Sequence, residues 1–296
     1  MDGWAYRLKP EKAELNLNPS YAAGIRKHFE DAAIQWHRHA NHALSSQVCC
    51  VNFLAPLAHE PDLLSRVVAQ ALKIAPPAML PVCGDRFVDF EWTGKEDYLS
   101  EWPKDGRATR GANATSADAV VRFDTGSTVC TALIEWKYTE CYGAPLADKN
   151  IPGHGNDKRR ARYADKLLDP DGPIRADLGL TIDDFFWEPF YQLVRQQMLA
   201  HRMEGACEDG AERVLVLHLS PRGNSDLHRV TSPALRKFGD DAFTVFSKLL
   251  VRPDRFHACN IESAFLPVID SVGRDSPSAD WAQYLRERYQ FLSEAA

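Results

Sequence analysis

Two carboxylates and one lysine stand in the segment 115–140, at positions where a buried sheet would carry apolar side chains. Asp118 opens one expected strand, and Glu135 and Lys137 close the next. Residues two apart in a strand share a face, so Glu135 and Lys137 point the same way. Carboxylate oxygens are the ligands that hard divalent cations prefer, and an ammonium group is a compact point charge. These side chains predict a charged chemical site at one end of a sheet.

A hairpin is the simplest structure that brings the three side chains together. The segment 123–127 supplies Asp124 and Gly126 for a tight reversal, and pairing of the strands then places Asp118 near Glu135. One face of the second strand is apolar and suited to burial, and the other is expected to begin half-buried. The apolar face carries Cys130, Ala132, Ile134, Trp136 and Tyr138, and the other carries Val129, Thr131, Leu133, Glu135 and Lys137.

The spacing of these residues resembles a known family pattern. Asp118, sixteen intervening residues and then Glu135-Trp136-Lys137 are similar to the signature of the PD-(D/E)XK nuclease superfamily, although Ala117 replaces its Pro. The resemblance covers roughly residues 40–220. It implies an α/β, restriction-endonuclease-like fold with an αβββαβ core and a mixed central sheet flanked by helices. The whole chain, 1–296, is expected to be one domain, with helical additions at 1–40 and 221–296.

The same resemblance implies a metal-dependent nuclease that hydrolyses phosphodiester bonds, with DNA as the expected substrate. Asp118, Glu135 and the backbone carbonyl of Trp136 would hold Mg²⁺ or Mn²⁺, and Lys137 would lie beside the attacking water. Glu91 is a further candidate ligand, since some members have an extra upstream carboxylate. A solvent-exposed strand glutamate is the simpler interpretation of that residue. A homodimer is compatible with the family, as are restriction, defence and repair.

Three other interpretations of the charged cluster stay open. A nuclease-fold protein without cleavage activity could serve as a nucleic-acid-binding or scaffolding module. A carboxylate-based hydrolase without a metal would leave Lys137 unexplained. The end of a solvated hairpin could carry an ordinary Glu–Lys pair. The sequence contains no G-x-S-x-G, P-loop or H-E-x-x-H motif, which removes the commonest other hydrolases.

Composition places the chain among ordinary globular proteins. It has 296 residues, of which 45% are hydrophobic and 26% charged. Its seven cysteines show no C-x-x-C spacing, which favours reduced thiols and a cytoplasmic location. No apolar run approaches the length of a membrane span. The formal net charge of −6 does not favour nucleic-acid binding, so a local basic surface is needed.

The segment 149–166 offers such a surface, with six basic and two acidic side chains in an otherwise acidic chain. A tyrosine lies among them, which suits phosphate contacts. An ordinary solvated helix face would look the same. The candidate substrate-binding residues of this segment are Lys158, Arg159, Arg160 and Arg162.

A later helix, expected from about residue 190 to 201, carries three more polar candidates. Gln192 and Gln196 lie four residues apart and share a face, with Arg195 nearby. RecB-like members of the superfamily have a Gln on this helix that positions substrate or water, although its Gln-x-x-x-Tyr form is not matched. A solvated polar face is the alternative.

The remaining elements follow from periodicity. Helices are predicted at 21–44, 61–74, 232–251 and 278–292, a helix start at Thr181, and strands at 87–92 and 213–220. Gln47 and Asn52 are expected to make hydrogen bonds in the core rather than contact substrate. His37 and His39 are expected to face solvent or substrate and not to bind metal, because no carboxylate stands nearby in the sequence.

Overall fold

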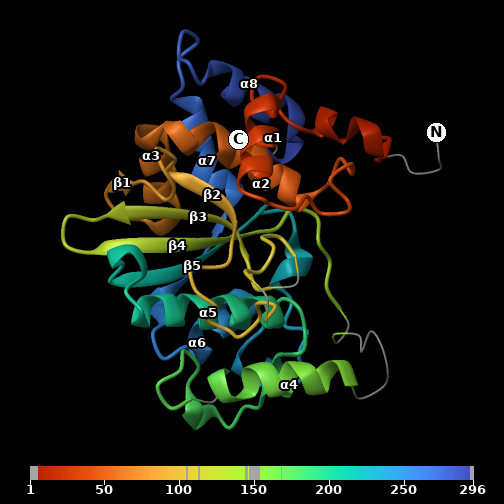
Figure 1. Ribbon diagram of the computed structural model, residues 1–296, viewed down its shortest axis with the longest axis vertical. Coiled ribbons are helices and arrows are strands. Elements are labelled where there is room, and N and C mark those ends of the chain that lie inside the picture. The colour runs from red at the N-terminus through yellow and green to blue at the C-terminus, as the bar shows by residue number, and fades with distance from the viewer. Residues whose placement is uncertain are drawn as a thin grey trace.

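Six strands form one mixed sheet at the centre of the molecule (Figure 1). The computed structural model describes residues 6–104, 106–112, 114–143, 146, 154–167 and 169–293. The strands are β1 (Ala78–Leu80), β2 (Val88–Trp92), β3 (Ala117–Asp124), β4 (Val129–Trp136), β5 (Arg213–Ser220) and β6 (Phe256–Asn260). β1 and β2 both pair antiparallel with β3, which pairs antiparallel with β4, and β4, β5 and β6 run parallel.

Helices cover both faces of this sheet (Figure 1). One face packs against α1 (Ala22–Asp31), α2 (Ser46–Leu54), α3 (Pro61–Leu72), α7 (Ile261–Asp270) and α8 (Ala279–Arg288). The other face packs against α5 (Phe190–Gly205) and α6 (Ala242–Leu249), and α4 (His154–Leu167) lies outside them, against α5 (Figure 1). Short 3-10 helices lie at Pro10–Asn16, Ala55–His59, Ala176–Leu178, Ile182–Phe185, Glu208–Gly210, Ser225–His228, Arg236–Phe238, Pro253–Arg255 and Gln290–Leu292.

The predicted fold class is confirmed. Along the chain α3, β2, β3, β4, α5 and β5 come in the expected αβββαβ order, with β1 inserted after α3 and α4 inserted after β4. Helices before and after this core add to it, as the sequence predicts. The face of β4 that is expected to begin half-buried does so at Val129, and Thr131 and Leu133, further along it, are buried. The helices on that face, α5 above all, cover them.

The predicted hairpin joins β3 to β4, and local chemistry explains its turn. The side chain of Asp124 accepts a hydrogen bond from the backbone N–H of Gly126 at 2.7 Å. Gly126 has a φ of 87°, a conformation that glycine adopts without steric cost. The turn therefore fixes the register in which β3 and β4 pair.

Several predicted boundaries are wrong. The helix expected at 21–44 ends at Asp31, because Ala33 takes a φ of 51° and Ile34 then bridges to Arg110. Only a 3-10 helix follows Thr181, and the helix expected from residue 232 begins at Ala242. The sequence prediction also lacks β1, β6 and α7. Two of these, β1 and β6, are short strands whose residues are partly exposed, so they lack the apolar alternation that marks a strand.

A cluster of aromatic rings ties the C-terminal segment to the core on the α2 face. The ring of Phe53 lies 5.1 Å from that of Trp136 and 5.0 Å from those of Phe265 and Tyr289. Phe53→Ala is expected to lower the free energy of unfolding by about 3–5 kcal/mol, because the lost contacts leave a cavity. Leu15→Ala, at a side chain that is 66% exposed, is expected to change it by less than about 0.5 kcal/mol. Urea unfolding of both variants measures the difference, and equal losses would contradict it.

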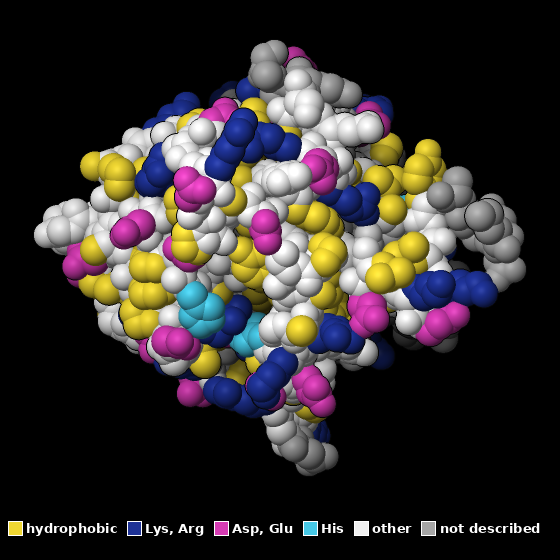
Figure 2. Space-filling view, turned by 90° about the horizontal axis from the view of Figure 1, so that it is seen from above, with side chains coloured by type: hydrophobic (Ala, Val, Ile, Leu, Met, Phe, Trp, Pro, Cys, Tyr) yellow, Lys and Arg dark blue, Asp and Glu magenta, His cyan; other side chains and the backbone are white. Residues whose placement is uncertain are grey.

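The molecular surface above α8 carries acidic and basic side chains interspersed with apolar ones (Figure 2). No single sign of charge dominates this view, in keeping with a chain whose acidic excess is modest. Within the described part of the chain, no helix combines the length and the apolar character needed to cross a membrane.

Candidate active site

Three acidic residues lie side by side at one end of the sheet, on three adjoining strands. The paired register of β3 and β4 runs to Ala119 and Ile134, so Asp118 and Glu135 face each other one step further on. On the other side of β3, the residues flanking Glu91 pair with those flanking Asp118. The register therefore places Glu91, Asp118 and Glu135 in a row across β2, β3 and β4.

Where the pairing of β3 with β4 ends, the side chain of Asp118 replaces a backbone carbonyl as the hydrogen-bond acceptor. Its Oδ2 accepts a hydrogen bond of 2.6 Å from the backbone N–H of Trp136. This bond holds the carboxylate against the residue that lies between Glu135 and Lys137. Among the described residues no hydrogen bond to Asp118 Oδ1 occurs, so that oxygen is available to a ligand.

Glu135 and Lys137 form a buried ion pair, with 4% and 8% of their surfaces exposed. The Nζ of Lys137 contacts Glu135 Oε1, and the side-chain amide of Gln196, on α5, donates to Glu135 Oε2. Lys137 lies just past the end of β4, where its backbone N–H donates to the carbonyl of Leu219 at 2.8 Å. β5 thus fixes the position of the lysine, and α5 fixes that of the carboxylate.

Burial dominates the protonation of this group. It raises the pKa of Asp118 and of Glu135 to about 7 each, although the positive charge of Lys137 opposes both shifts. Burial alone would lower the pKa of Lys137, but the charge of Glu135, with smaller contributions from its neighbours, raises it well above its usual value. Lys137 is therefore charged at neutral pH, while the two carboxyls are poised to give up protons to a cation.

Glu91 belongs to the same buried cluster, so its interpretation as a solvent-exposed strand residue is wrong. Only 2% of its surface is exposed. Gln47 donates to its Oε1 at 2.7 Å and Ser116 to its Oε2 at 2.9 Å. Its backbone φ of 49° departs from extended geometry, which costs free energy for a residue with a Cβ. Burial raises the pKa of Glu91, opposed by these hydrogen bonds.

His37 approaches this cluster, contrary to the expectation that no carboxylate stands near it. Its Nε2 lies 3.4 Å from Glu91 Oε1. Gln47 links the two, because its Oε1 accepts from the backbone N–H of His37 at 2.8 Å while its amide donates to Glu91. The expected core hydrogen bonding of Gln47 is therefore confirmed. Burial lowers the pKa of His37, and the positive charge of Lys137 lowers it further.

The three polar candidates on α5 have different surroundings. Gln196 is buried and reaches Glu135, so a solvated face is the wrong interpretation there. The side chain of Arg195 points elsewhere and donates from Nε to Thr115 Oγ1 at 3.0 Å. In the described part of the chain, no hydrogen bond joins the side chain of Gln192 to the acidic cluster, and its backbone N–H donates to Glu188 Oε2 at 3.2 Å.

The basic residues of α4 do not touch the acidic cluster, and they differ among themselves. Arg160 pairs with Asp157 and Asp183, both at 2.7 Å, so its charge is neutralised. Lys158, Arg159 and Arg162 instead line a cavity of about 330 Å³, whose wall also includes Arg195.

Two titratable groups near Lys137 are not among the site residues predicted from the sequence. His218 stands beside Glu135 in the parallel register of β4 and β5, is 1% exposed, and has no hydrogen-bond partner among the described residues. Burial lowers its pKa well below the usual value, and the charge of Lys137 lowers it further. A polar side chain within an otherwise apolar strand is the sequence feature that could have identified His218 as a candidate.

Glu188 is the second such group. Burial raises its pKa, and the charge of Lys137 opposes this shift. No feature of the sequence around Glu188 identifies it as a candidate.

The donor chemistry of the cluster suits a hard cation. Asp118 and Glu135 supply carboxylate oxygens, and Trp136, between Glu135 and Lys137, can supply a carbonyl oxygen. Within the residues that the structure describes, no three His, Cys, Asp or Glu side chains converge into a metal site by themselves. A backbone or solvent oxygen would complete the coordination, as Mg²⁺ sites usually require.

Comparison with known proteins identifies a family for this chain. The profile of a family described as Restriction Endonuclease associating with ARP matches residues 3–290. No curated protein and no solved structure matches the chain.

Proposed function

Because the chain belongs to the family of restriction endonucleases associating with ARP, we propose that it is a metal-dependent nuclease that hydrolyses phosphodiester bonds in DNA. One observation carries the proposal. Asp118 and Glu135 face each other at the end of the β3–β4 ladder, and Lys137 is paired with Glu135 in the same buried cluster. This is a pair of oxygen ligands with a fixed positive charge beside them.

Each residue has a distinct task in the proposed site. Asp118, Glu135 and the carbonyl of Trp136 would hold Mg²⁺ or Mn²⁺, which when bound polarises the phosphate and lowers the pKa of a coordinated water. Lys137 stabilises the negative charge that develops on the phosphate oxygens and the attacking oxygen. Gln196 holds Glu135 in place through its amide. Glu91, at the end of the row of acids, adds negative charge that attracts a cation.

A cleavage panel tests the proposal. Plasmid, linear duplex and single-stranded DNA, and RNA, are each incubated with Mg²⁺, with Mn²⁺ or with EDTA. Cutting that requires metal and prefers DNA is the expected result. If no substrate is cut, and calorimetry detects no metal binding to a folded protein, the chain is instead a catalytically inactive nucleic-acid-binding or scaffolding protein, and the Lys137–Glu135 pair is structural.

Gln196→Met is expected to weaken Mg²⁺ binding by about 10–100-fold, because a ligand carboxylate loses the group that orients it. Gln197→Met is the matched control. Gln197 is the next residue of α5 and is equally buried, but it makes no hydrogen bond to Glu135. Titration calorimetry of both proteins measures the difference. Equal weakening in the two variants would show that general repacking of α5, and not the Gln196 amide, is responsible.

A further inference from the structure

The cavity between α4 and α5 has a strongly positive lining. It measures about 330 Å³, and four cationic side chains and one carboxylate contribute to its wall. We propose that this cavity binds a phosphate group of the nucleic-acid strand, next to the phosphate that is cut at the acidic cluster. The inference rests on the proposed nuclease function and assigns it a phosphate-binding subsite. The charged residues of the lining are Lys158, Arg159, Arg162, Arg195 and Glu101.

Three of the four positive charges in this lining have no carboxylate partner in the described structure, while the fourth, Arg195, interacts with the charge of Glu101. No ion pair joins Lys158, Arg159 or Arg162 to a carboxylate in the part of the chain that the structure describes. The one acidic group, Glu101, already accepts hydrogen bonds from Thr115, at 2.6 Å from the backbone N–H and 2.9 Å from Oγ1. An anion entering the cavity therefore meets three cationic side chains, those of Lys158, Arg159 and Arg162, that lack a charged partner among the described residues.

Two of the guanidinium groups are held by an aromatic ring. The guanidinium carbons of Arg159 and Arg195 lie 5.5 Å and 5.0 Å from the ring centre of Tyr191. Contact with a ring face restrains a guanidinium without a carboxylate, so its N–H groups stay available for phosphate oxygens. Arg195 is fixed further by its 3.0 Å hydrogen bond to Thr115. The donors are thus positioned before a ligand arrives, which lowers the entropic cost of binding.

Two short stretches of chain connect the cavity to the acidic cluster. On α5, Arg195 lines the cavity and the next residue, Gln196, donates to Glu135. Before β3, Thr115 bonds to Arg195, and the next residue, Ser116, bonds to Glu91. The carbonyl of Ser116 also accepts from Gln196 at 3.3 Å, which closes the connection. In both stretches, a residue at the cavity and a residue at the acidic cluster are consecutive in the chain, so the two sites are adjacent. Neighbouring phosphates of one nucleic-acid strand are adjacent in the same way.

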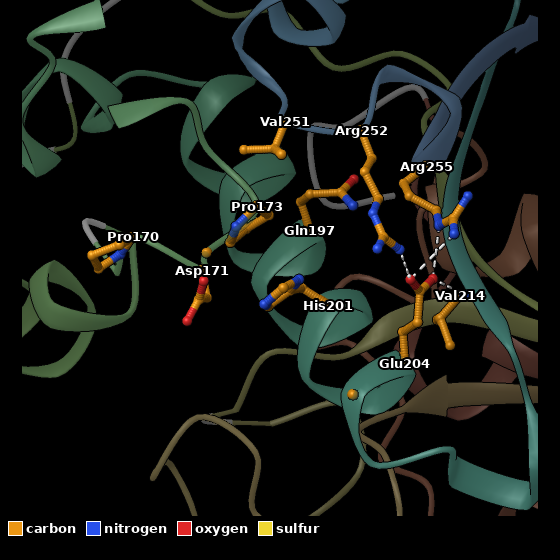
Figure 3. Close-up of a pocket in the computed structure, with 12 residues that line it drawn as sticks. Pro170, Asp171, Pro173, Gln197, His201, Glu204, Val214, Val251, Arg252 and Arg255 are labelled. Carbon is orange, nitrogen blue, oxygen red and sulfur yellow. Dashed lines mark hydrogen bonds and ion pairs between the residues drawn. The ribbon is translucent and has the colours of Figure 1, made fainter. Parts of the chain in front are cut away.

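A second cavity, further along α5, has the opposite character. It measures about 450 Å³ and contains Arg252 and Arg255, but both point at Glu204, which pairs with them at 2.5 Å and 2.7 Å (Figure 3). Both arginines of this cavity are therefore paired with a carboxylate. The comparison shows that free positive charge, and not the presence of arginine alone, distinguishes the cavity beside α4.

Replacement of Arg162 tests the subsite, and Arg160 on the same helix provides the control. Both Arg162→Gln and Arg160→Gln remove one positive charge from α4, but Arg160 is paired with Asp157 and Asp183 and does not line the cavity. Binding of a short fluorescein-labelled DNA strand, and of the matching duplex, is followed by anisotropy in EDTA at several salt concentrations. Arg162→Gln is expected to weaken binding by about tenfold or more. The slope of the logarithm of the DNA-binding constant against the logarithm of the salt concentration should also become shallower, by the amount that corresponds to about one phosphate contact.

Arg160→Gln is expected to leave the affinity within about twofold of the parent. Equal weakening by the two variants overturns the subsite, because it would show that only the total charge of α4 matters. Inorganic phosphate is titrated as a competitor in the same assay. If it binds in an Arg162-dependent way while DNA affinity stays unchanged in Arg162→Gln, the cavity holds a free anion and the strand assignment is wrong. Since binding is measured without metal, a lack of cleavage would overturn the proposed nuclease activity without touching this result.

Discussion

DNA cleavage by a Lys137→Met protein is expected to be about 10²–10⁴-fold slower than cleavage by the parent. Methionine keeps most of the length of the lysine side chain but removes the ammonium that contacts Glu135. Without it, no positive charge at this position stabilises the developing negative charge. Initial rates at saturating Mg²⁺ measure the effect. Lys27→Met, at an exposed lysine paired with Asp31 on α1, is the control and should cut at the parental rate.

Folding of the Lys137→Met protein should depend on pH, which separates a catalytic loss from unfolding. The positive charge of Lys137 lowers the pKa of Glu135, so its removal raises that pKa above about 7. At acidic pH Glu135 is protonated in the variant and leaves no bare buried charge. As pH rises the folded state must ionise an unpaired carboxyl, so the variant should lose stability relative to the parent. A folded variant that cuts DNA at the parental rate would contradict the role of Lys137.

Magnesium is expected to bind the protein more weakly as pH falls below about 7. The pKa values of Asp118 and Glu135 are each about 7, against ordinary values of 3.8 and 4.5, so a cation must displace protons from both. Each displaced proton lowers the apparent affinity by about tenfold per pH unit. Calorimetry in buffers of different ionisation enthalpy gives the number of protons released. Asp118→Asn should reduce that number, and an affinity equal at acidic and alkaline pH would contradict the linkage.

The same shifts set how the metal-free protein responds to pH. Both carboxyls hold their protons more tightly in the folded chain than in the unfolded chain, so unfolding releases protons between about pH 4 and pH 7. The stability of the metal-free protein should therefore fall as pH rises through that window. Thermal unfolding with EDTA and with Mg²⁺ should diverge most at the alkaline end, where the cation replaces the displaced protons.

The sequence predicts those residues of the site that lie close to one another in the chain. Asp118, Glu135 and Lys137 lie on one hairpin, so strand alternation and the turn at Gly126 suffice to bring them together. Gln196 was identified as a candidate, but only the packing of α5 on the sheet decides that it, and not Gln192, reaches Glu135. Contacts between distant segments depend on such packing, which periodicity does not encode.

Glu91 and the arginines of α4 show why the remaining assignments failed or stayed open. Glu91 is buried by partners from α2 and from the residue before β3, and its unusual φ has no signature in the sequence. The sequence alone does not distinguish Arg160 from Arg162, because both are arginines within the same basic segment. They differ because Asp183, more than twenty residues away in the chain, pairs with one and not the other.

The ion pair between Lys137 and Glu135 gives the protein a resident counterion. A site built only from acidic groups would leave like charges facing each other whenever its cation departs, and the fold would have to bear that repulsion. Here the ammonium of Lys137 already belongs to the cluster and offsets the charge of one of its three acidic groups, so less repulsion remains when no cation is present. In the proposed nuclease, the same lysine would stabilise the metal-free fold and, with the cation bound, the negative charge that develops in the reaction.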